Sequence, residues 1–324
     1  MRKSIYITKK TGQLIFTLYI IATVNFLLFR VLPGDPLKLL ARSGNLTADA
    51  IARLREIFGL DQPLGVQYLI YLKNILSGQF GYSVTFRRPV MEIISERFLN
   101  TLILLAAATV VVIVIGVGLG ILAGMRRGTK TDKFLVVTSM VGWSLPTFWT
   151  GLMLIIAFGV FMHTFPIAGI STPGASYASV FALIKDYANH LVLPTAALVI
   201  VDMAQFFLIT RNTLVDVLTE DYVLTAKAKG LTPGGMLWRH AMPNAMLPII
   251  TTLTLYVSLV IGGAIQVETV FSYPGMGMLM YDAVLKRDYP ILEASFFLLA
   301  TVTILSNFLS DVLYRVIDPR VKSL

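Results

Sequence analysis

The chain has 324 residues, of which 56% are hydrophobic and only 14% are charged. Because an ordinary soluble domain has roughly 25% charged residues, this composition excludes a soluble protein and predicts an all-α integral membrane protein. The net charge of +9 does not indicate nucleic acid as a partner, since cytoplasmic loops rich in Lys and Arg give a membrane chain the same excess.

The chain contains no cysteine, which excludes disulfides, thiolate metal sites and cysteine nucleophiles. Its three histidines, His163, His190 and His240, are far apart and lack the spacing of metal ligands. We therefore expect neither a metal nor a cofactor in this chain.

An apolar run at residues 14–32 follows a basic N-terminal segment. A secretory signal peptide is the competing interpretation, but the run is longer than a typical signal core and ends without a small-residue cleavage site. We interpret it as a first spanning helix that is retained. Arg30, near its end, is expected to extend to the lipid–water interface.

A polar region follows at residues 33–100, with too many charges to span a membrane. Within it, residues 47–58 have apolar side chains on one helical face, and residues 67–76 are predicted to form a second helix. Residues 79–83 are predicted to form a turn. The region is expected to be one large loop on the outer side.

Five more apolar segments are long enough to span a membrane, which gives six spans in total. We expect the third to be bent at Pro146 and the residues between spans, such as 165–190, to be loops. In the second, Gly116, Gly120 and Gly124 recur every four residues, so another helix is expected to approach that face closely. The five segments are residues 101–125, 134–162, 191–209, 249–267 and 291–312.

Six spans place both termini on one side of the membrane. That side then holds 15 Lys and Arg residues, against three in the two short loops opposite. Positively charged loops stay in the cytoplasm, so both termini and the segment between the fourth and fifth spans are predicted to be cytoplasmic.

This cytoplasmic segment, residues 219–248, has the sequence signals of two short helices. Thr219 is suited to cap the first helix, and Gly230 is suited to end it in the left-handed conformation. Thr232 then caps a second helix that starts at Pro233. Pro243 and Pro248 are expected to end this helix or to bend it.

Each of these helices has only about ten residues, which is too short for stability alone in water. Since neither has a soluble core of its own to pack on, we infer that another protein completes the pair. Met236, Leu237 and Trp238 are the candidate anchors for that protein. The alternative is an amphipathic helix pair that lies on lipid headgroups.

Polar residues inside the predicted spans are the candidates for a translocation path. Asp202, with Gln205 one turn on, either contacts a substrate ammonium or is hydrogen-bonded between helices, and both interpretations remain open. In the fifth span, Thr254 and Ser258 are candidates to line the path, and Gln266 and Glu268 to form an outer gate. The chain contains no Gly-x-x-x-x-Gly-Lys-Ser/Thr phosphate loop, so ATP binding by that motif is excluded.

Residues 222–248 resemble the cytoplasmic EAA loop of binding-protein-dependent ABC importers. Gly230 matches the anchor glycine and Pro243 the later proline, while Leu224-Thr225-Ala226 replaces Glu-Ala-Ala and keeps only the last alanine. The resemblance assigns contact with an ATPase to Tyr222, Ala226, Lys229, Gly230, Leu231, Met236, Leu237 and Trp238.

Motifs along nearly the whole chain are similar to the first permease subunit of dipeptide, oligopeptide and nickel importers. They are residues 32–36 (Leu-Pro-Gly-Asp-Pro), 59–63 (Gly-Leu-Asp-Gln-Pro), 67–68 (Gln-Tyr), 221–223 (Asp-Tyr-Val), 228–231 (Ala-Lys-Gly-Leu), 270–277 (Val-Phe-Ser-Tyr-Pro-Gly-Met-Gly), 287–290 (Arg-Asp-Tyr-Pro) and 318–320 (Asp-Pro-Arg).

This resemblance implies a type I importer core at residues 98–314, preceded by a span and outer loop at residues 1–97 and followed by a cytoplasmic tail at residues 315–324. It implies a bacterial or archaeal inner-membrane protein that pairs with a second, homologous permease subunit. Two cytoplasmic ATPases, which bind ATP and Mg²⁺, and an external substrate-binding protein complete the implied machine. The implied substrate is a short peptide.

Three alternatives stay open. The same machinery also carries oligosaccharides, glutathione or nickel chelates in proteins of this kind. A self-contained secondary transporter or channel is a different class, but it needs ion-coupling acids in the membrane and leaves residues 219–248 without a role. A membrane-embedded enzyme would need clustered catalytic groups, which the sequence lacks.

Overall fold

The structure is a computed structural model that describes residues 3–31, 61–83 and 85–317. Within these helices it describes the backbone but not the side chains of residues 3–6, 31, 224, 227, 233, 254–255, 257–263, 310 and 313–317. The regular elements of the described part are helices, with one isolated bridge between Tyr82 and Pro89. The predicted helix at residues 47–58 lies outside the described residues.

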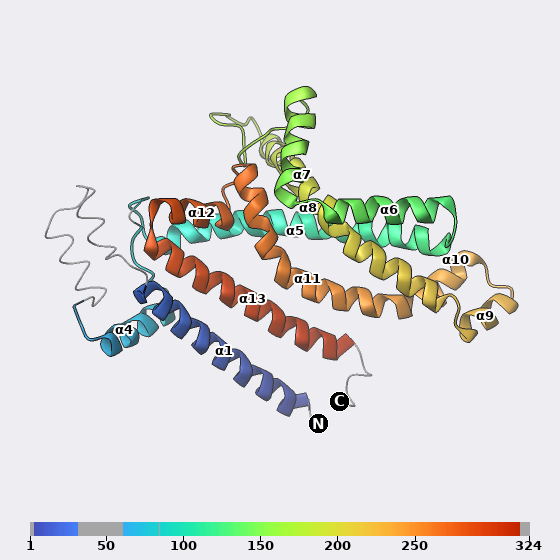
Figure 1. Ribbon diagram of the computed structural model, residues 1–324, viewed down its shortest axis with the longest axis horizontal. Helices are drawn as coiled ribbons and strands as arrows, with labels where there is room; N and C mark the ends of the chain where they lie inside the picture. The colour runs from blue at the N-terminus through green and yellow to red at the C-terminus, as the bar shows by residue number, and fades with distance from the viewer. Residues whose placement is uncertain (1–2, 32–60, 84, 318–324) are drawn as a thin grey trace. The chain divides into compact units, whose positions relative to one another are not determined.

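The helices follow one another along the chain as labelled in Figure 1. Their bounds are α1 Lys3–Val31, α4 Leu64–Leu76, α5 Val90–Met125, α6 Lys130–Ser144, α7 Thr147–Leu154, the π-helix η1 Ile155–Phe161, α8 Val180–Val217, α9 Asp221–Ala228, α10 Pro233–Met236, the π-helix η2 Leu237–Ala241, α11 Met242–Val270, α12 Met276–Lys286 and α13 Tyr289–Ile317.

Four described helices are long and apolar enough to cross a membrane, and a bent pair makes a fifth if it is counted as one span. The four candidates are Ile7–Arg30, Val90–Met125, Val180–Val217 and Tyr289–Leu309. The bent pair, Lys130–Ser144 with Thr147–Phe161, turns by 103° at the predicted break before Pro146. A proline disfavours helical geometry in the residue before it, which explains the extended conformation of Leu145.

Three predicted boundaries are wrong. Helix α5, which carries the second predicted span, already begins at Val90, because Val90, Ile93 and Ile94 bury an apolar face although the charged Glu92 lies between them. The predicted loop at residues 165–190 is helical from Val180, where the Ser179 hydroxyl accepts a hydrogen bond from the Ala182 N–H. The predicted loop before the last span contains helix α12, which buries Met276 and Leu279.

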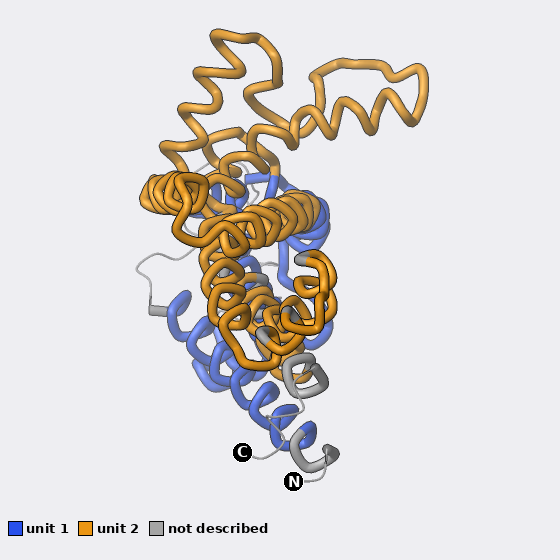
Figure 2. Tube along the Cα trace, turned by 90° about the vertical axis from the view of Figure 1, so that its right-hand side faces the viewer, with its two compact units in different colours: residues 1–100, 275–305 blue, residues 101–274, 306–324 orange. Residues whose placement is uncertain are grey.

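The chain divides into two compact units, which Figure 2 colours separately. One unit contains residues 1–100 and 275–305, and the other contains residues 101–274 and 306–324. In the first, Val90, Ile93 and Ile94 pack in one apolar cluster with residues of α12 and α13, such as Leu279 and Ile291.

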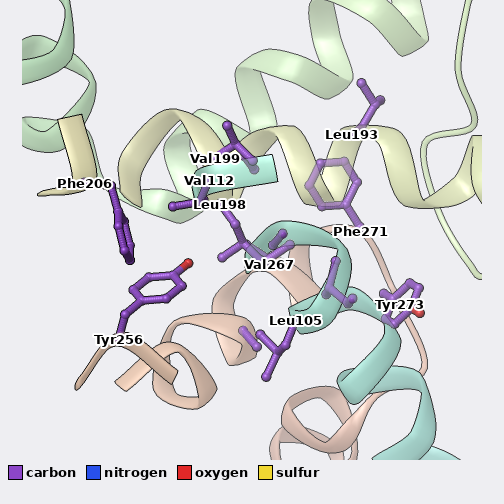
Figure 3. Close-up of a cluster of buried hydrophobic side chains, with 14 of the residues drawn as sticks. Leu105, Val112, Leu193, Leu198, Val199, Phe206, Tyr256, Val267, Phe271 and Tyr273 are labelled. Atoms are coloured by element: carbon purple, nitrogen blue, oxygen red, sulfur yellow. The ribbon is translucent and has the colours of Figure 1, made fainter. Parts of the chain in front are cut away.

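The core of the second unit joins residues of α5, α8 and α11 (Figure 3). Phe206 of α8 and Tyr256 of α11 are both buried, and their rings meet edge to face at 5.3 Å. Phe271 and Tyr273, just after α11, belong to the same cluster. This core therefore fixes the helices that carry the candidate path residues and lead into the candidate coupling segment.

The predicted close approach at the α5 glycines is confirmed. A Cβ added to Gly116 would lie 2.8 Å from the Phe206 Cβ, and one added to Gly120 would lie 2.6 Å from the Thr210 Cβ. At Gly124 it would lie 3.1 Å from a methyl group of Leu214. The glycine face of α5 thus packs directly on α8, which is the helix-packing role that the spacing predicts.

Arg30 is half-buried near the end of α1, and its predicted position at the interface stays a prediction. Its guanidinium lies over the ring of Phe26, with 5.3 Å from Cζ to the ring centroid, and its Nε atom is buried. Arg30 also lines a cleft of mixed polar and apolar residues.

Candidate coupling segment and translocation path

The first half of the candidate coupling segment is a short helix with a glycine stop. Helix α9 runs over Asp221–Ala228, and Gly230 follows with φ +81°. The N–H of Leu231 donates to the carbonyl of Ala226 at 3.4 Å and closes this turn. The left-handed glycine is therefore confirmed. Thr219 does not cap as predicted, because its hydroxyl donates to the Asp216 carbonyl at 2.7 Å and the helix begins two residues later.

The second half is not a separate helix. The Thr232 hydroxyl accepts a hydrogen bond from the Gly235 N–H at 3.2 Å, and α10 begins at Pro233 as predicted. The helical path then continues through the π-helical turn η2 into α11. Pro243 does not end it, although Pro243 lies inside this continuous helical path, directly after η2, and lacks the N–H of one backbone hydrogen bond. The short helix α10 and the 29-residue helix α11 thus belong to one helical path.

The segment also has a packing site on its own chain, contrary to the prediction. Leu237, Ala241 and Met242 are buried in a cluster with Leu214 near the end of α8. The cause is the continuous helix from α10 to α11, which places η2 against α8. Leu237 thus anchors the segment internally, and this corrects its prediction as an anchor for a partner.

Two aromatic side chains remain on the exposed face of the segment. Trp238 is 64% exposed, directly after the buried Leu237. Tyr222 is 42% exposed, and its hydroxyl accepts a hydrogen bond from the Asn244 Nδ2 at 2.9 Å. This bond ties α9 to the start of α11 and fixes the position of the Tyr222 ring.

The other predicted coupling residues differ in accessibility. Lys229 and Gly230 are exposed, and Leu231 and Met236 are half-buried. Ala226 is buried and does not offer its side chain to a partner. The predicted set therefore separates into residues that face outward and residues that hold the segment together.

Asp202 forms a hydrogen bond between two helices in the core of the second unit. The Tyr256 hydroxyl donates to its Oδ2 at 2.8 Å, and this bond joins α8 to α11. Asp202 is half-buried and Tyr256 is buried. This geometry favours the structural interpretation of Asp202 in this state, while its contact with a substrate stays a prediction.

The remaining path candidates differ in burial. Gln205 is half-buried and Gln266 is exposed. Glu268 is fully buried, and the Thr101 hydroxyl donates to its Oε1 at 2.6 Å, which joins α5 to α11. The side chains of Thr254 and Ser258 lie outside the described residues.

Sequence reasoning missed an ion pair between Asp132 in α6 and Arg211 in α8. The guanidinium donates to both carboxylate oxygens, with Nε–Oδ1 at 2.6 Å and Nη2–Oδ2 at 2.8 Å. Both residues lie on the predicted cytoplasmic side, at the ends of apolar runs. The available signal was therefore one acid and one base at the same predicted membrane depth.

Two family models match the chain. "Binding-protein-dependent transport system inner membrane component" matches residues 116–323, and the model of the N-terminal part of such membrane components matches residues 4–105. Together they extend over nearly the whole chain.

Curated relatives align over almost their full length. The oligopeptide transport system permease protein AppB of Bacillus subtilis is 36% identical over 318 residues, with 98% of this chain and 99% of the relative covered. The dipeptide transport system permease protein DppB of Escherichia coli K12 is 35% identical, with 98% of each covered. The glutathione transport system permease protein GsiC of Salmonella typhimurium is 38% identical, also with 98% of each covered.

Among solved structures, the inward-facing MetNI methionine ABC transporter has a chain that matches with a TM-score of 0.57 at 17% identity. The match covers 70% of this chain and 97% of that chain, and at this identity it shows the fold alone. The full-length relatives and the model that matches residues 116–323 show more: this chain belongs to the binding-protein-dependent transport system inner membrane components, as a multi-pass permease subunit of an ABC importer that is not itself an ATPase.

Proposed function

We propose that this chain forms half of the translocation path of an importer for short peptides. The other half is a second, homologous permease subunit. Two cytoplasmic ATPases supply the energy with ATP and Mg²⁺, and an external binding protein delivers the substrate. The name of the matching family already includes dependence on a binding protein.

The proposed topology has six spans with both termini in the cytoplasm. Helix α11 has 29 residues, about 43 Å at 1.5 Å per residue, and is thus long enough to be the sixth span beside the other five candidates. Residues 1–97 then form the first span and an outer loop, residues 98–314 the importer core, and residues 315–324 a cytoplasmic tail. The coupling segment at residues 219–248 lies on the cytoplasmic side.

The observation that carries the coupling role is the pair of neighbours Leu237 and Trp238. Leu237 is 5% exposed and packs on α8, while Trp238 is 64% exposed. An exposed tryptophan next to an internal anchor is a favourable arrangement for binding a groove on a partner protein. Tyr222, braced by Asn244, adds a second aromatic group.

The continuous path from α10 to α11 supports a mechanical role for the segment. When the two ATPases close on ATP, they displace the exposed surface around Trp238. The displacement passes directly into α11 and, through the cluster around Leu237, into α8. Rigid-body movement of these helices then alternates the path between inward-open and outward-open states.

The peptide substrate is supported by the names of the relatives, which transport oligopeptides, dipeptides and glutathione. Uptake of labelled dipeptide, tripeptide, glutathione, an oligosaccharide and a nickel chelate by cells that carry the complete operon, with and without this chain, tests the proposal. We expect peptide uptake to depend on the chain. Uptake of only the saccharide or nickel chelate would overturn the peptide assignment without affecting the coupling role.

The coupling role is tested separately with Trp238→Asp in the purified complex. We expect loss of ATPase subunits during purification and at least tenfold slower transport, because a desolvated anchor typically contributes about 2 kcal/mol or more. Tyr281→Asp, at a 49% exposed aromatic residue of α12, is the matched control and should retain the ATPases. Normal assembly and transport in Trp238→Asp would refute the role.

A secondary transporter remains the alternative from another class. Its test is the purified chain alone in liposomes without any ATPase. Accumulation of solute against its gradient there would contradict the proposed dependence on partner subunits.

A further inference from the structure

We propose that a cleft in the first unit binds the zwitterionic headgroup of a phospholipid, with Arg30 on its phosphate and Glu293 on its ammonium. The cleft is outside the candidate path residues and the coupling segment. It lies between α1, α4 and the start of α13 and is partly open to solvent. Besides these two charges, its lining includes Tyr71, Asn74, Gln79 and Phe80.

Arg30 and Glu293 line this cleft with neither a hydrogen bond nor an ion pair between them, although they interact electrostatically at longer range. The Arg30 Nε is buried and has no hydrogen-bond partner among the described residues. Neither hydrogen bond nor ion pair joins the Glu293 carboxylate to a described residue, although the Glu293 backbone carbonyl accepts from the Asn25 Nδ2 at 3.0 Å. Charges removed from water are costly unless they are paired, so the arrangement favours a ligand that neutralises both.

The geometry selects a zwitterion over a simple ion. An anion alone satisfies Arg30 and repels Glu293, and a cation alone does the reverse. A phosphate accepts several hydrogen bonds from a guanidinium, and the side-chain amides of Asn74 and Gln79 are further donors in the same lining. A primary ammonium donates to the carboxylate and is attracted by aromatic faces such as Tyr71 and Phe80.

The surroundings favour a membrane lipid over a free solute. Arg30 ends the candidate span Ile7–Arg30, which places its charge at headgroup depth. Next to it on α1, Leu27 is 53% and Leu28 is 49% exposed, and on α4 Leu69 is 66% exposed. An amphiphile can therefore place its headgroup in the charged cleft and its acyl chains along apolar helix surface.

A hydrogen bond and a ring contact hold Tyr71, an aromatic residue of the cleft lining, in place. The Tyr71 hydroxyl accepts a hydrogen bond from the Asn25 Nδ2 at 3.0 Å, and its ring contacts Phe26 at 5.4 Å between centroids. Burial raises the pKa of the Tyr71 hydroxyl, so this group stays neutral at physiological pH. The site is thus a preformed, partly aromatic surface around Arg30 and Glu293.

The test is lipid binding to the purified, delipidated transporter, measured by native mass spectrometry. Phosphatidylethanolamine should bind about tenfold tighter than phosphatidylglycerol, which has no ammonium, and tighter than phosphatidylcholine, whose quaternary ammonium has no N–H. Equal binding of the three lipids would overturn the proposal, and this comparison needs no variant.

Variants then test whether the preference for phosphatidylethanolamine arises in the cleft. Glu293→Gln should remove most of the preference for phosphatidylethanolamine over phosphatidylglycerol. Arg30→Gln should weaken the binding of both lipids. The matched control Glu92→Gln, at a side chain that is 58% exposed in α5, should leave the preference unchanged. An unchanged preference in folded Glu293→Gln would place the lipid elsewhere and refute the site.

Soluble competitors show whether the ligand of the cleft is a lipid or a free zwitterion. Phosphoethanolamine should displace phosphatidylethanolamine only at concentrations far above those of the lipid, because it lacks acyl chains. Displacement by the dipeptide Ala-Ala at lower concentrations than phosphoethanolamine would assign the cleft to a free peptide and overturn the lipid proposal.

Discussion

Arg211 donates hydrogen bonds to both carboxylate oxygens of Asp132, at 2.6 and 2.8 Å. This ion pair connects the start of α6 with the part of α8 that leads into the coupling segment. Asp132 is only 2% exposed, and its Oδ2 also accepts a hydrogen bond from the Gly128 N–H at 2.9 Å. The turn between α5 and α6 is therefore bound to α8 at the same end as the exposed Trp238.

Removing one side of this ion pair should destabilise the chain. We expect Asp132→Asn to lower the free energy of unfolding by about 2 kcal/mol, below the roughly 3–5 kcal/mol of fully buried pairs because the Arg211 side chain is 22% exposed. The measurement is thermal unfolding of the purified complex. Arg88→Gln, which breaks an exposed pair with Glu96, is the control and should leave the melting temperature unchanged. Equal effects in the two variants would contradict the inference.

The glycine face of α5 offers a comparison between neighbouring positions. A Cβ at Gly120 would meet the Thr210 Cβ at 2.6 Å and the Phe207 carbonyl oxygen at 2.8 Å, whereas nothing lies within 4 Å of a Cβ at Gly118. Gly120→Ala should therefore cost about 1–3 kcal/mol by overpacking. Gly118→Ala should be neutral or stabilising by up to about 1 kcal/mol, because alanine favours the helix. Denaturant titration of both variants measures the difference, and a stable Gly120→Ala would disprove the close packing.

Gly230 tests whether the left-handed turn of the coupling segment matters for transport. Its φ of +81° is costly for a residue with a side chain, by about 1–2 kcal/mol, although asparagine tolerates this region better. Transport-coupled ATPase activity should fall several-fold in Gly230→Ala and recover in part in Gly230→Asn. Gly234→Ala is the control, because its Cβ would have nothing within 4 Å and its backbone is helical. Full activity of Gly230→Ala would exclude a role for this turn.

The bond between Tyr256 and Asp202 distinguishes the two interpretations of this aspartate. A structural bond predicts that Tyr256→Phe and Asp202→Asn each lower stability by about 0.5–1.5 kcal/mol, and that the double variant costs less than their sum. A substrate contact predicts that Asp202→Asn changes the preference among substrates while Tyr256→Phe does not. Unfolding and uptake assays on the same three variants separate these outcomes.

Local signals in the sequence predicted several features that the structure confirms. The break before Pro146, the left-handed Gly230 and the start of α10 at Pro233 depend on the backbone limits of proline and glycine, which act wherever the residue lies. The approach of α8 to the α5 glycines agrees with the four-residue spacing of missing side chains. Membership of the importer family came from motifs in order along the chain, and the full-length relatives confirm it.

The errors occur where distant residues decide the local structure. Charged residues near Val90 indicated a loop, but burial of Ile93 and Ile94 against α12 and α13 extends the helix through them. Leu237 and Trp238 are adjacent apolar residues with the same sequence signals, and only packing on Leu214 makes one internal and the other exposed.

The sequence by itself determined that this is a membrane protein, where its helices break or end in a glycine turn, and to which family it belongs. The reason is that hydropathy, backbone sterics and the order of motifs are properties of the chain. Tertiary structure alone decided which polar groups meet. Asp132 forms an ion pair with Arg211 and Asp202 accepts a hydrogen bond from Tyr256, whereas Arg30 and Glu293 line one cleft without an ion pair. The physical reason is that electrostatic and packing energies depend on distance in space, which separations of 79 and 54 residues along the chain do not reveal.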